Sequence, residues 1–223
     1  MKMYLTLCLT IAMLLGGLGV SADFQKGRKA ASSGDFITAL RELEPLAEQG
    51  FSDAQAILGI MHEFGDGVPQ DYKVAVKWYK LAAKKGSSLA QYNLGNLYRR
   101  GLGVSKDYKI AMKWYLLSAK QGFAESQINL GRMYENGDGI PQDYKIAMKW
   151  YSQAAKQGHA SAQFNLANLL KNGQGIIQDY IAAVKWFKKA ADQGNSLAQY
   201  NLGVIYKDGQ GVAKNITSSA KWF

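Results

Sequence analysis

The nine residues DYKIAMKWY occur at 107–115 and again, unchanged, at 143–151, so the two copies start 36 residues apart. Close variants continue the series in both directions, at 71–79, 179–187 and 215–223. Several independent columns keep this period, which is the sequence signature of an array of stacked supersecondary units. The tryptophans of the chain all fall in one such column: Trp78, Trp114, Trp150, Trp186 and Trp222.

One unit, taken as residues 87–122, has the pattern of two helices joined by a glycine-rich loop. Gly101 suits a left-handed helix end, and Asp107 offers a side-chain oxygen to the free amides that open a second helix. We expect helices of roughly 13 and about 15 residues, and no stretch alternates as a strand does. The predicted class is therefore all-α, built from antiparallel helix pairs. The expected apolar stripes are Ala90, Leu94, Leu97 and Tyr98 on the first helix, and Tyr108, Ala111, Met112, Tyr115 and Ala119 on the second.

Small residues in fixed columns predict that the paired helices approach closely. A glycine inside a helix costs about 1 kcal/mol relative to alanine, so its recurrence in one column indicates a packing requirement. We also expect the tryptophan column to be buried and structural. The two small-residue columns are Gly59, Gly95, Gly131, Ala167 and Gly203, and Ala83, Ala119, Ala155 and Ala191.

The pattern A-x-x-x-L-G-x-x-Y-x-x-G-x-G-V, then D-Y-x-x-A-x-x-W-Y-x-x-A-A-x-x-G, is carried nearly throughout by residues 90–122. It resembles the Sel1-like repeat, a relative of the tetratricopeptide repeat, and the resemblance covers residues 23–223. This implies a right-handed α-solenoid of antiparallel helix pairs, a superhelix with a 36-residue period. It also implies a non-catalytic scaffold for protein–protein interaction.

The N-terminus predicts export, and the remainder predicts one repeat domain. Residues 1–22 combine an early lysine, an apolar run too short for a membrane span and small residues before Asp23, as secretory signal peptides do. We expect cleavage near Ala22/Asp23, release into a bacterial periplasm or beyond, and no stable membrane insertion afterwards. The predicted domain, residues 23–223, comprises a divergent helix pair at 23–50, repeats at about 51–86, 87–122, 123–158 and 159–194, and a partial repeat at 195–223.

The formal net charge of +10 raises the question of anionic partners. Nucleic acid is the usual partner of a basic chain, but the predicted export argues against it. We interpret the recurring lysines of the second helices as a solvated outer face, with loose attraction to anionic envelope polymers or lipid headgroups as the functional reading. These lysines are Lys73, Lys77, Lys109, Lys113, Lys145, Lys149 and Lys185.

No residue pattern in the chain predicts a cofactor, a metal site or catalysis. His62 and His159 lie too far apart in the repeat scheme to share a metal, and a match to S-x-x-K at 218–221 lacks its companion motifs. The enzymatic alternative is penicillin binding or hydrolysis, which the resemblance links to cysteine-rich Sel1-like proteins. Cys8, inside the predicted signal peptide, is the single cysteine of this chain, which disfavours that alternative.

The candidate partner-binding residues lie on the first helix of each pair. In the related tetratricopeptide fold this helix lines the concave side, and some members use asparagine at the matching position, with basic neighbours, to hold a peptide carboxylate. An amide both donates and accepts, so a ladder of amides suits an extended peptide backbone. We expect a concave groove for an extended, acidic or C-terminal peptide segment of an envelope protein. Its predicted residues are Asn93, Asn96, Arg100, Asn129, Arg132, Asn165, Asn168 and Asn201.

Overall fold

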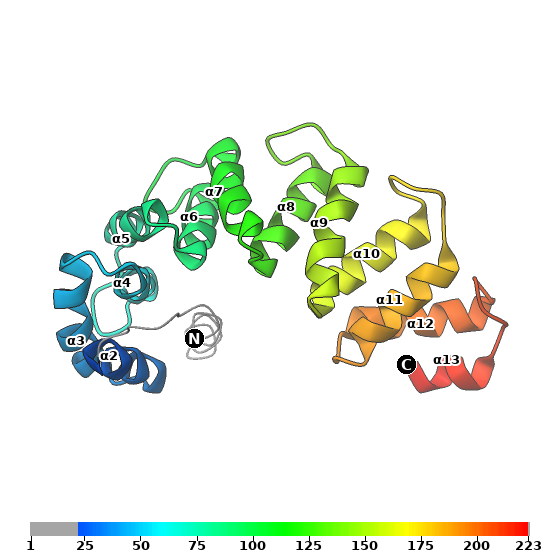
Figure 1. Ribbon diagram of the computed structural model, residues 1–223. Coiled ribbons are helices and arrows are strands. Elements are labelled where there is room, and N and C mark those ends of the chain that lie inside the picture. Colours follow the sequence, from blue (N-terminus) through cyan, green and yellow to red (C-terminus); the bar gives the residue numbers. More distant parts are fainter. Residues whose placement is uncertain (1–21, 223) are drawn as a thin grey trace. The chain divides into compact units, whose positions relative to one another are not determined.

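The computed structural model describes residues 22–222, which form twelve α-helices and no strand (Figure 1). Consecutive helices pack as pairs, so the predicted all-α repeat of helix pairs is confirmed. The predicted signal peptide lies outside the described residues except for Ala22. The helices are α2 (Ala22–Ser33), α3 (Phe36–Glu48), α4 (Ser52–Phe64), α5 (Tyr72–Lys84), α6 (Ser88–Arg100), α7 (Tyr108–Lys120), α8 (Ala124–Asn136), α9 (Tyr144–Lys156), α10 (Ala160–Asn172), α11 (Tyr180–Ala191), α12 (Ser196–Asp208) and α13 (Ile216–Trp222).

The chain divides into two compact units, and the boundary in the sequence falls between Phe123 and Ala124. Unit 1 contains the described helices α2 to α7, and unit 2 contains α8 to α13. Each unit has its own apolar core, because the inner stripes of its helix pairs cover one another.

Local sequence signals set the helix boundaries. Asp107 caps α7 by accepting a hydrogen bond from the Ile110 amide at 2.9 Å, and aspartates cap α5, α9 and α11 in the same way. Gly101 ends α6 in the left-handed conformation, with φ 73°. The second helices α5, α7 and α9 have 13 residues, slightly fewer than expected.

The first of the two small-residue columns makes room for an aromatic ring from the second helix. This glycine column comprises Gly59, Gly95, Gly131, Ala167 and Gly203. A side chain at Gly95 would begin 2.7 Å from the ring of Tyr115, and one at Gly131 would begin 2.5 Å from the ring of Tyr151. The fully buried aromatic column is therefore Tyr79, Tyr115, Tyr151 and Phe187, each 0% exposed.

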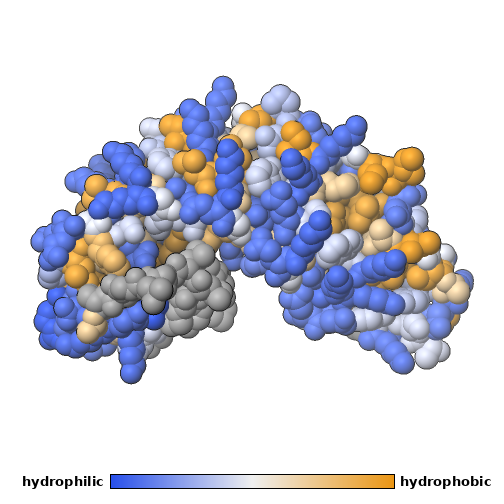
Figure 2. Space-filling model, in the orientation of Figure 1, coloured by the Kyte–Doolittle hydropathy of each residue, from blue (hydrophilic) through white to orange (hydrophobic). Residues whose placement is uncertain are grey.

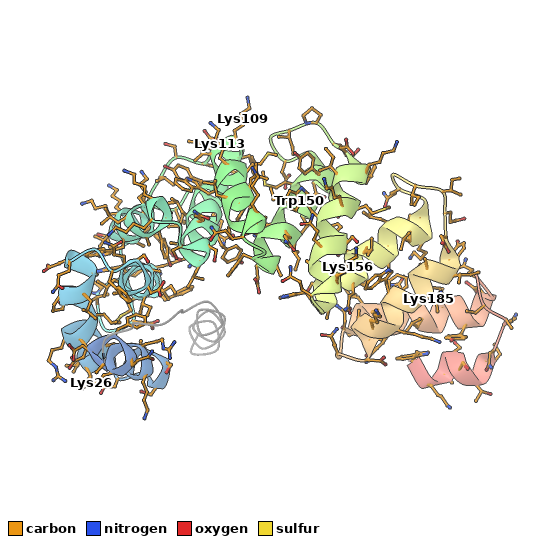
Figure 3. All side chains as sticks on the ribbon, in the orientation of Figure 1. Lys26, Lys109, Lys113, Trp150, Lys156 and Lys185 are labelled. Atoms are coloured by element: carbon orange, nitrogen blue, oxygen red, sulfur yellow. The ribbon has the colours of Figure 1, made fainter. Side chains whose placement is uncertain are left out.

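The expectation that the tryptophans are buried is wrong in part. Trp78, Trp114, Trp150, Trp186 and Trp222 are all partly exposed. Each of the first four directly precedes a buried aromatic residue, as Trp150 on α9 precedes Tyr151 (Figure 3). Neighbouring side chains on a helix point about 100° apart, so both cannot face the glycine column. The tyrosine or phenylalanine takes the inner position, and the indole covers its flank.

The glycine-rich loops join one repeat to the preceding one. In the loop between α10 and α11, Gly175 lies against the start of α9. A side chain at Gly175 would begin 2.8 Å from the backbone nitrogen of Lys145. Gly103 lies in the same way on Tyr72, and Gly211 on Tyr180. The second glycine of these three loops is thus needed for close contact between repeats.

Buried glutamines also join successive repeats. Gln163, on α10, donates from Nε2 to the Ala155 carbonyl at the end of α9, at 3.2 Å. Its Oε1 accepts a hydrogen bond from Gln193 Nε2 at 2.8 Å. Gln91 makes the same pair of bonds in unit 1, with Ala83 and Gln121. This column therefore gives helix-end carbonyls a second hydrogen bond, beside the ones that Ala155 accepts from the Gly158 amide and Ala83 from the Gly86 amide.

Replacing Gln163 by leucine should lower the free energy of unfolding of unit 2 by about 1–3 kcal/mol, because the Ala155 carbonyl and the Gln193 amide each lose one of their hydrogen bonds. Chemical denaturation measures this change. Gln25→Leu, at an exposed position of α2, is the control and should change stability by no more than about 0.5 kcal/mol. Equal effects of the two substitutions would contradict a structural role for the column.

Candidate protein-interaction face

The buried tyrosines of the second helices reach the polar side chains of the first helices. Tyr115 Oη donates to Asn96 Oδ1 on α6 at 2.7 Å, and Arg99 Nε donates to Tyr115 Oη at 3.3 Å. The ring thus crosses beneath α6 at Gly95 and ends among polar groups of that helix. The first-helix face of each unit is the exposed side of its first helices, which are α2, α4 and α6 in unit 1 and α8, α10 and α12 in unit 2. The tyrosine hydrogen bonds hold polar side chains of this face in defined positions.

The same arrangement recurs with different partners in the other repeats. Tyr79 Oη donates to Glu63 Oε2 at 2.8 Å, and Tyr151 Oη donates to Glu135 Oε2 at 2.6 Å. Burial, and then the hydrogen bond to Glu135, raise the pKa of Tyr151, while a hydrogen bond with Asn165 acts in the opposite direction. The hydroxyl therefore stays protonated and remains a donor.

Within unit 1, the three predicted residues on α6 differ in exposure. Asn93 is only 6% exposed, Asn96 is partly buried and bonded to Tyr115, and Arg100 is exposed. Because α4 contacts the first helices on both sides of it, α2 and α6, these helices form one continuous face. Arg100 is the predicted residue most available to a partner on this face.

Within unit 2, the predicted residues divide into bonded and available groups. Asn201 Oδ1 accepts a hydrogen bond from Lys171 Nζ at 2.7 Å, and its Nδ2 donates to the Leu197 carbonyl at 2.8 Å. Asn165 is engaged with Tyr151, and Asn129 is partly buried. Arg132 is exposed, and Asn168 is partly exposed. The last two make no side-chain hydrogen bond within residues 22–222.

Sequence reasoning missed that four charged residues form one column that joins these groups, namely Glu63, Arg99, Glu135 and Lys171. Glu63, Arg99 and Glu135 hydrogen-bond to the tyrosine hydroxyls. In the repeat where Phe187 replaces tyrosine, Lys171 instead bonds to Asn201 of the next repeat. The available signal was an ionisable residue four positions after each small residue of the glycine column. That spacing places both on one helix face.

Glu63 is the buried carboxyl in this column, at 6% exposure. Burial raises the pKa of Glu63, while the Tyr79 hydrogen bond and the Arg100 charge act in the opposite direction. A carboxyl whose pKa is higher in the folded than in the unfolded state stabilises the fold below its unfolded pKa. This contribution is lost as pH rises through the folded pKa.

Glu63→Gln should therefore gain stability relative to the wild type as pH rises from about 5 to about 8. The amide still accepts from Tyr79 but carries no charge to desolvate. Denaturation of both chains across this range measures the difference, in which the contributions of other carboxyls cancel. Tyr79→Phe, which removes the donor, should make the loss of stability with pH steeper than in the wild type. A difference that stays constant or shrinks with rising pH would contradict the assignment.

The described residues contain neither a cluster of metal ligands nor a membrane-spanning helix. No group of three or more metal-ligating side chains comes together in residues 22–222. No helix in that range is long and apolar enough to cross a bilayer. His62 is on α4 and His159 precedes α10, so they belong to different units.

Family membership follows from the sequence profile of the Sel1 repeat, which matches most of the chain. The chain belongs to the Sel1 repeat family. Sel1 repeat proteins generally mediate protein–protein interactions as non-catalytic scaffolds. A search of curated proteins found no match. The matched residues are 7–35, which overlaps the predicted signal peptide, and 52–87, 88–123, 124–159, 160–195 and 196–223.

Solved structures with the same fold come from several bacteria. A Sel1 repeat protein from Oxalobacter formigenes is 28% identical with a TM-score of 0.84, over 91% of this chain and 81% of that one. The protein c5321, a protective antigen of uropathogenic Escherichia coli strains with an SLR fold, is 33% identical with a TM-score of 0.60. That match covers 97% of this chain and 55% of c5321. Immunity protein Pa5087 from Pseudomonas aeruginosa, at 18% identity and a TM-score of 0.51, covers 99% and 75% and shares the fold alone.

Proposed function

We propose that this chain is a non-catalytic adaptor of the bacterial cell envelope that holds an extended, acidic or C-terminal peptide segment of another protein on its first-helix faces. The observation that carries the proposal is that basic and amide side chains are exposed on the first helices. Buried tyrosines hydrogen-bond to neighbouring polar groups of these helices and hold them in place. In unit 1 the contacts come from Asn96 and Arg100, with Asn93 behind them. In unit 2 they come from Asn129, Arg132, Asn165, Asn168 and Asn201.

The arginines supply affinity for a carboxylate, and the asparagines pair with a peptide backbone. An interface of this polar kind should have a dissociation constant on the order of micromolar. Because Asn165 and Asn201 also bond within the chain, their loss would disturb the fold. The informative substitutions are therefore at Arg100, Arg132 and Asn168.

Photo-crosslinking in the native envelope tests the proposal. A crosslinking residue at position 168 should capture a protein partner, and Arg132→Glu should lower the yield at least about tenfold, since it reverses the charge beside the carboxylate. Lys113→Glu, on an exposed position of second helix α7, is the matched control and should keep the yield. Unchanged capture by a folded Arg132→Glu chain would refute the first-helix face. Turnover of nitrocefin by the folded chain would instead favour the penicillin-hydrolysing alternative.

The envelope location rests on the signal-like residues 1–22. Cleavage before Asp23 would retain Phe24, which is 3% exposed and packs edge-on against Phe51 at 4.8 Å between ring centroids. Mass spectrometry of the exported chain should find an N-terminus at or near Asp23. A chain that retains Met1 in the membrane fraction would contradict this location.

A further inference from the structure

Unit 2 carries an exposed apolar patch at the junction of the α10–α11 loop with α11. Ile177 is 89% exposed, Ile181 60% and Ile176 46%. Hydrophobic surface gathers where this loop lies, at the upper right of Figure 2. Other repeats have Pro69, Ser105 and Pro141 in the column of Ile177, and Lys73, Lys109 and Lys145 in that of Ile181. Ile177 and Ile181 are therefore specific to this repeat, whereas the column of Ile176 is apolar in the other repeats as well.

Lysines flank the isoleucines on both sides. The loop rests on the first turn of α9 through Gly175, which brings it beside Lys145. Lys149 follows one turn further along α9, and Lys185 follows Ile181 by one turn on α11. All three lysines are exposed, and none forms an ion pair within residues 22–222.

The balance of charge around the patch is positive. Helices α9 and α11 contain six lysines and no acidic residue. Asp143 and Asp179 cap the starts of these two helices, and each accepts a backbone amide hydrogen bond. Such capping carboxylates are partly compensated by the helix dipole.

We propose that this patch docks the chain on an anionic lipid bilayer. Isoleucines at a loop tip would enter the boundary between headgroups and acyl chains, and the flanking lysines would contact anionic headgroups. A second copy or a globular partner could cover the isoleucines, but it would not require unpaired lysines around them. Charge complementarity therefore favours the lipid surface. This goes beyond peptide binding, because the patch lies on a loop and second helices rather than on the first-helix face.

Vesicle co-sedimentation tests the proposal, using the chain that begins at Asp23 so that residues 1–22 do not bind lipid themselves. The chain should bind vesicles of phosphatidylcholine and phosphatidylglycerol but not of phosphatidylcholine alone, and salt should weaken the binding. Ile177→Asp should reduce binding at least about tenfold, and so should the combined change of Lys145, Lys149 and Lys185 to glutamine.

Two matched controls test whether any exposed isoleucine, or any three lysines, would have the same effect on vesicle binding as those of the patch. Ile37→Asp changes an isoleucine that is 81% exposed on α3, in unit 1, and should leave binding unchanged. Changing Lys73, Lys77 and Lys113 to glutamine removes the same charge from the equivalent columns of unit 1, and should weaken binding far less than the unit 2 triple change. Circular dichroism confirms that each variant is folded.

Three results would overturn the proposal. Equal losses from the unit 1 and unit 2 lysine changes would mean that net charge alone drives binding. Insensitivity to Ile177→Asp, with competition by soluble polyphosphate, would assign the lysines to a dissolved polyanion. Concentration-dependent dimerisation that Ile177→Asp abolishes, without vesicle binding, would assign the patch to a second copy of the chain.

Discussion

Tyr115→Ala should lower the free energy of unfolding of the α6–α7 pair by about 3–5 kcal/mol, the usual cost of deleting a large buried aromatic side chain. The ring is 0% exposed and lies against Gly95, so its loss leaves a cavity that α6 cannot fill with a side chain. The substitution also removes the hydroxyl that donates to Asn96.

Amide hydrogen exchange in α6 and α7 is the suitable measurement, because repeat arrays open in segments. Tyr115→Phe keeps the ring and should cost about 1 kcal/mol, which isolates the hydroxyl's contribution. Trp114→Ala is the neighbouring control and should cost less than Tyr115→Ala, since the indole is partly exposed. A larger effect at Trp114 than at Tyr115 would contradict the assignment of the buried column.

The second large effect is expected from Gly95→Leu, at about 3 kcal/mol or more. Overpacking a core typically costs about 1–3 kcal/mol, and here even the first side-chain carbon would lie 2.7 Å from the Tyr115 ring. The gain in helix propensity over glycine, about 1 kcal/mol, offsets only part of this cost. The helix pair would have to separate to admit the new side chain.

Thermal and chemical denaturation compare this variant with Lys113→Leu, which adds leucine at an exposed position of α7. The control should change stability by no more than about 0.5 kcal/mol. If Gly95→Leu were as stable as the wild type, the contact between glycine and tyrosine would not be what fixes the glycine column.

The sequence was sufficient to predict the helix pairs and their boundaries, because the signals are local. Asp107 caps and Gly101 terminates helices through groups within one turn of chain. The stripe of Ala90, Leu94 and Leu97 is buried as expected, since helical periodicity determines which residues share a face.

The identity of the buried aromatic column could not be read from periodicity alone. Trp114 and Tyr115 are adjacent, and both have the composition of core residues. Which of them faces Gly95 depends on the rotation of α7 against α6, a tertiary property. The stabilising role of Gln163 depends likewise on the end of the preceding helix.

The polar face was only partly predictable for the same reason. Asn93, Asn165 and Asn201 fall in one column with Asn129, yet their environments differ, because the tyrosine hydroxyl and the charged residue beneath them change from repeat to repeat. Ile177 and Ile181 differ from the other residues of their columns, whereas Ile176 shares its column with apolar residues. The exposure of the three became evident only once the loop was placed on α9.

The most direct test of the proposed function is a titration of the isotope-labelled chain with the peptide segment of the captured partner, followed by nuclear magnetic resonance. The side-chain amide signals of Asn96 and Asn168 and the Arg132 Nε–H signal should shift, with a dissociation constant on the order of micromolar. Gln142 and Gln178 lie in loops, and their amides bond to carbonyls in the last turns of α8 and α10, so their signals should not shift. Shifts confined to those two glutamines, with the first-helix signals unchanged, would contradict binding on the first-helix faces.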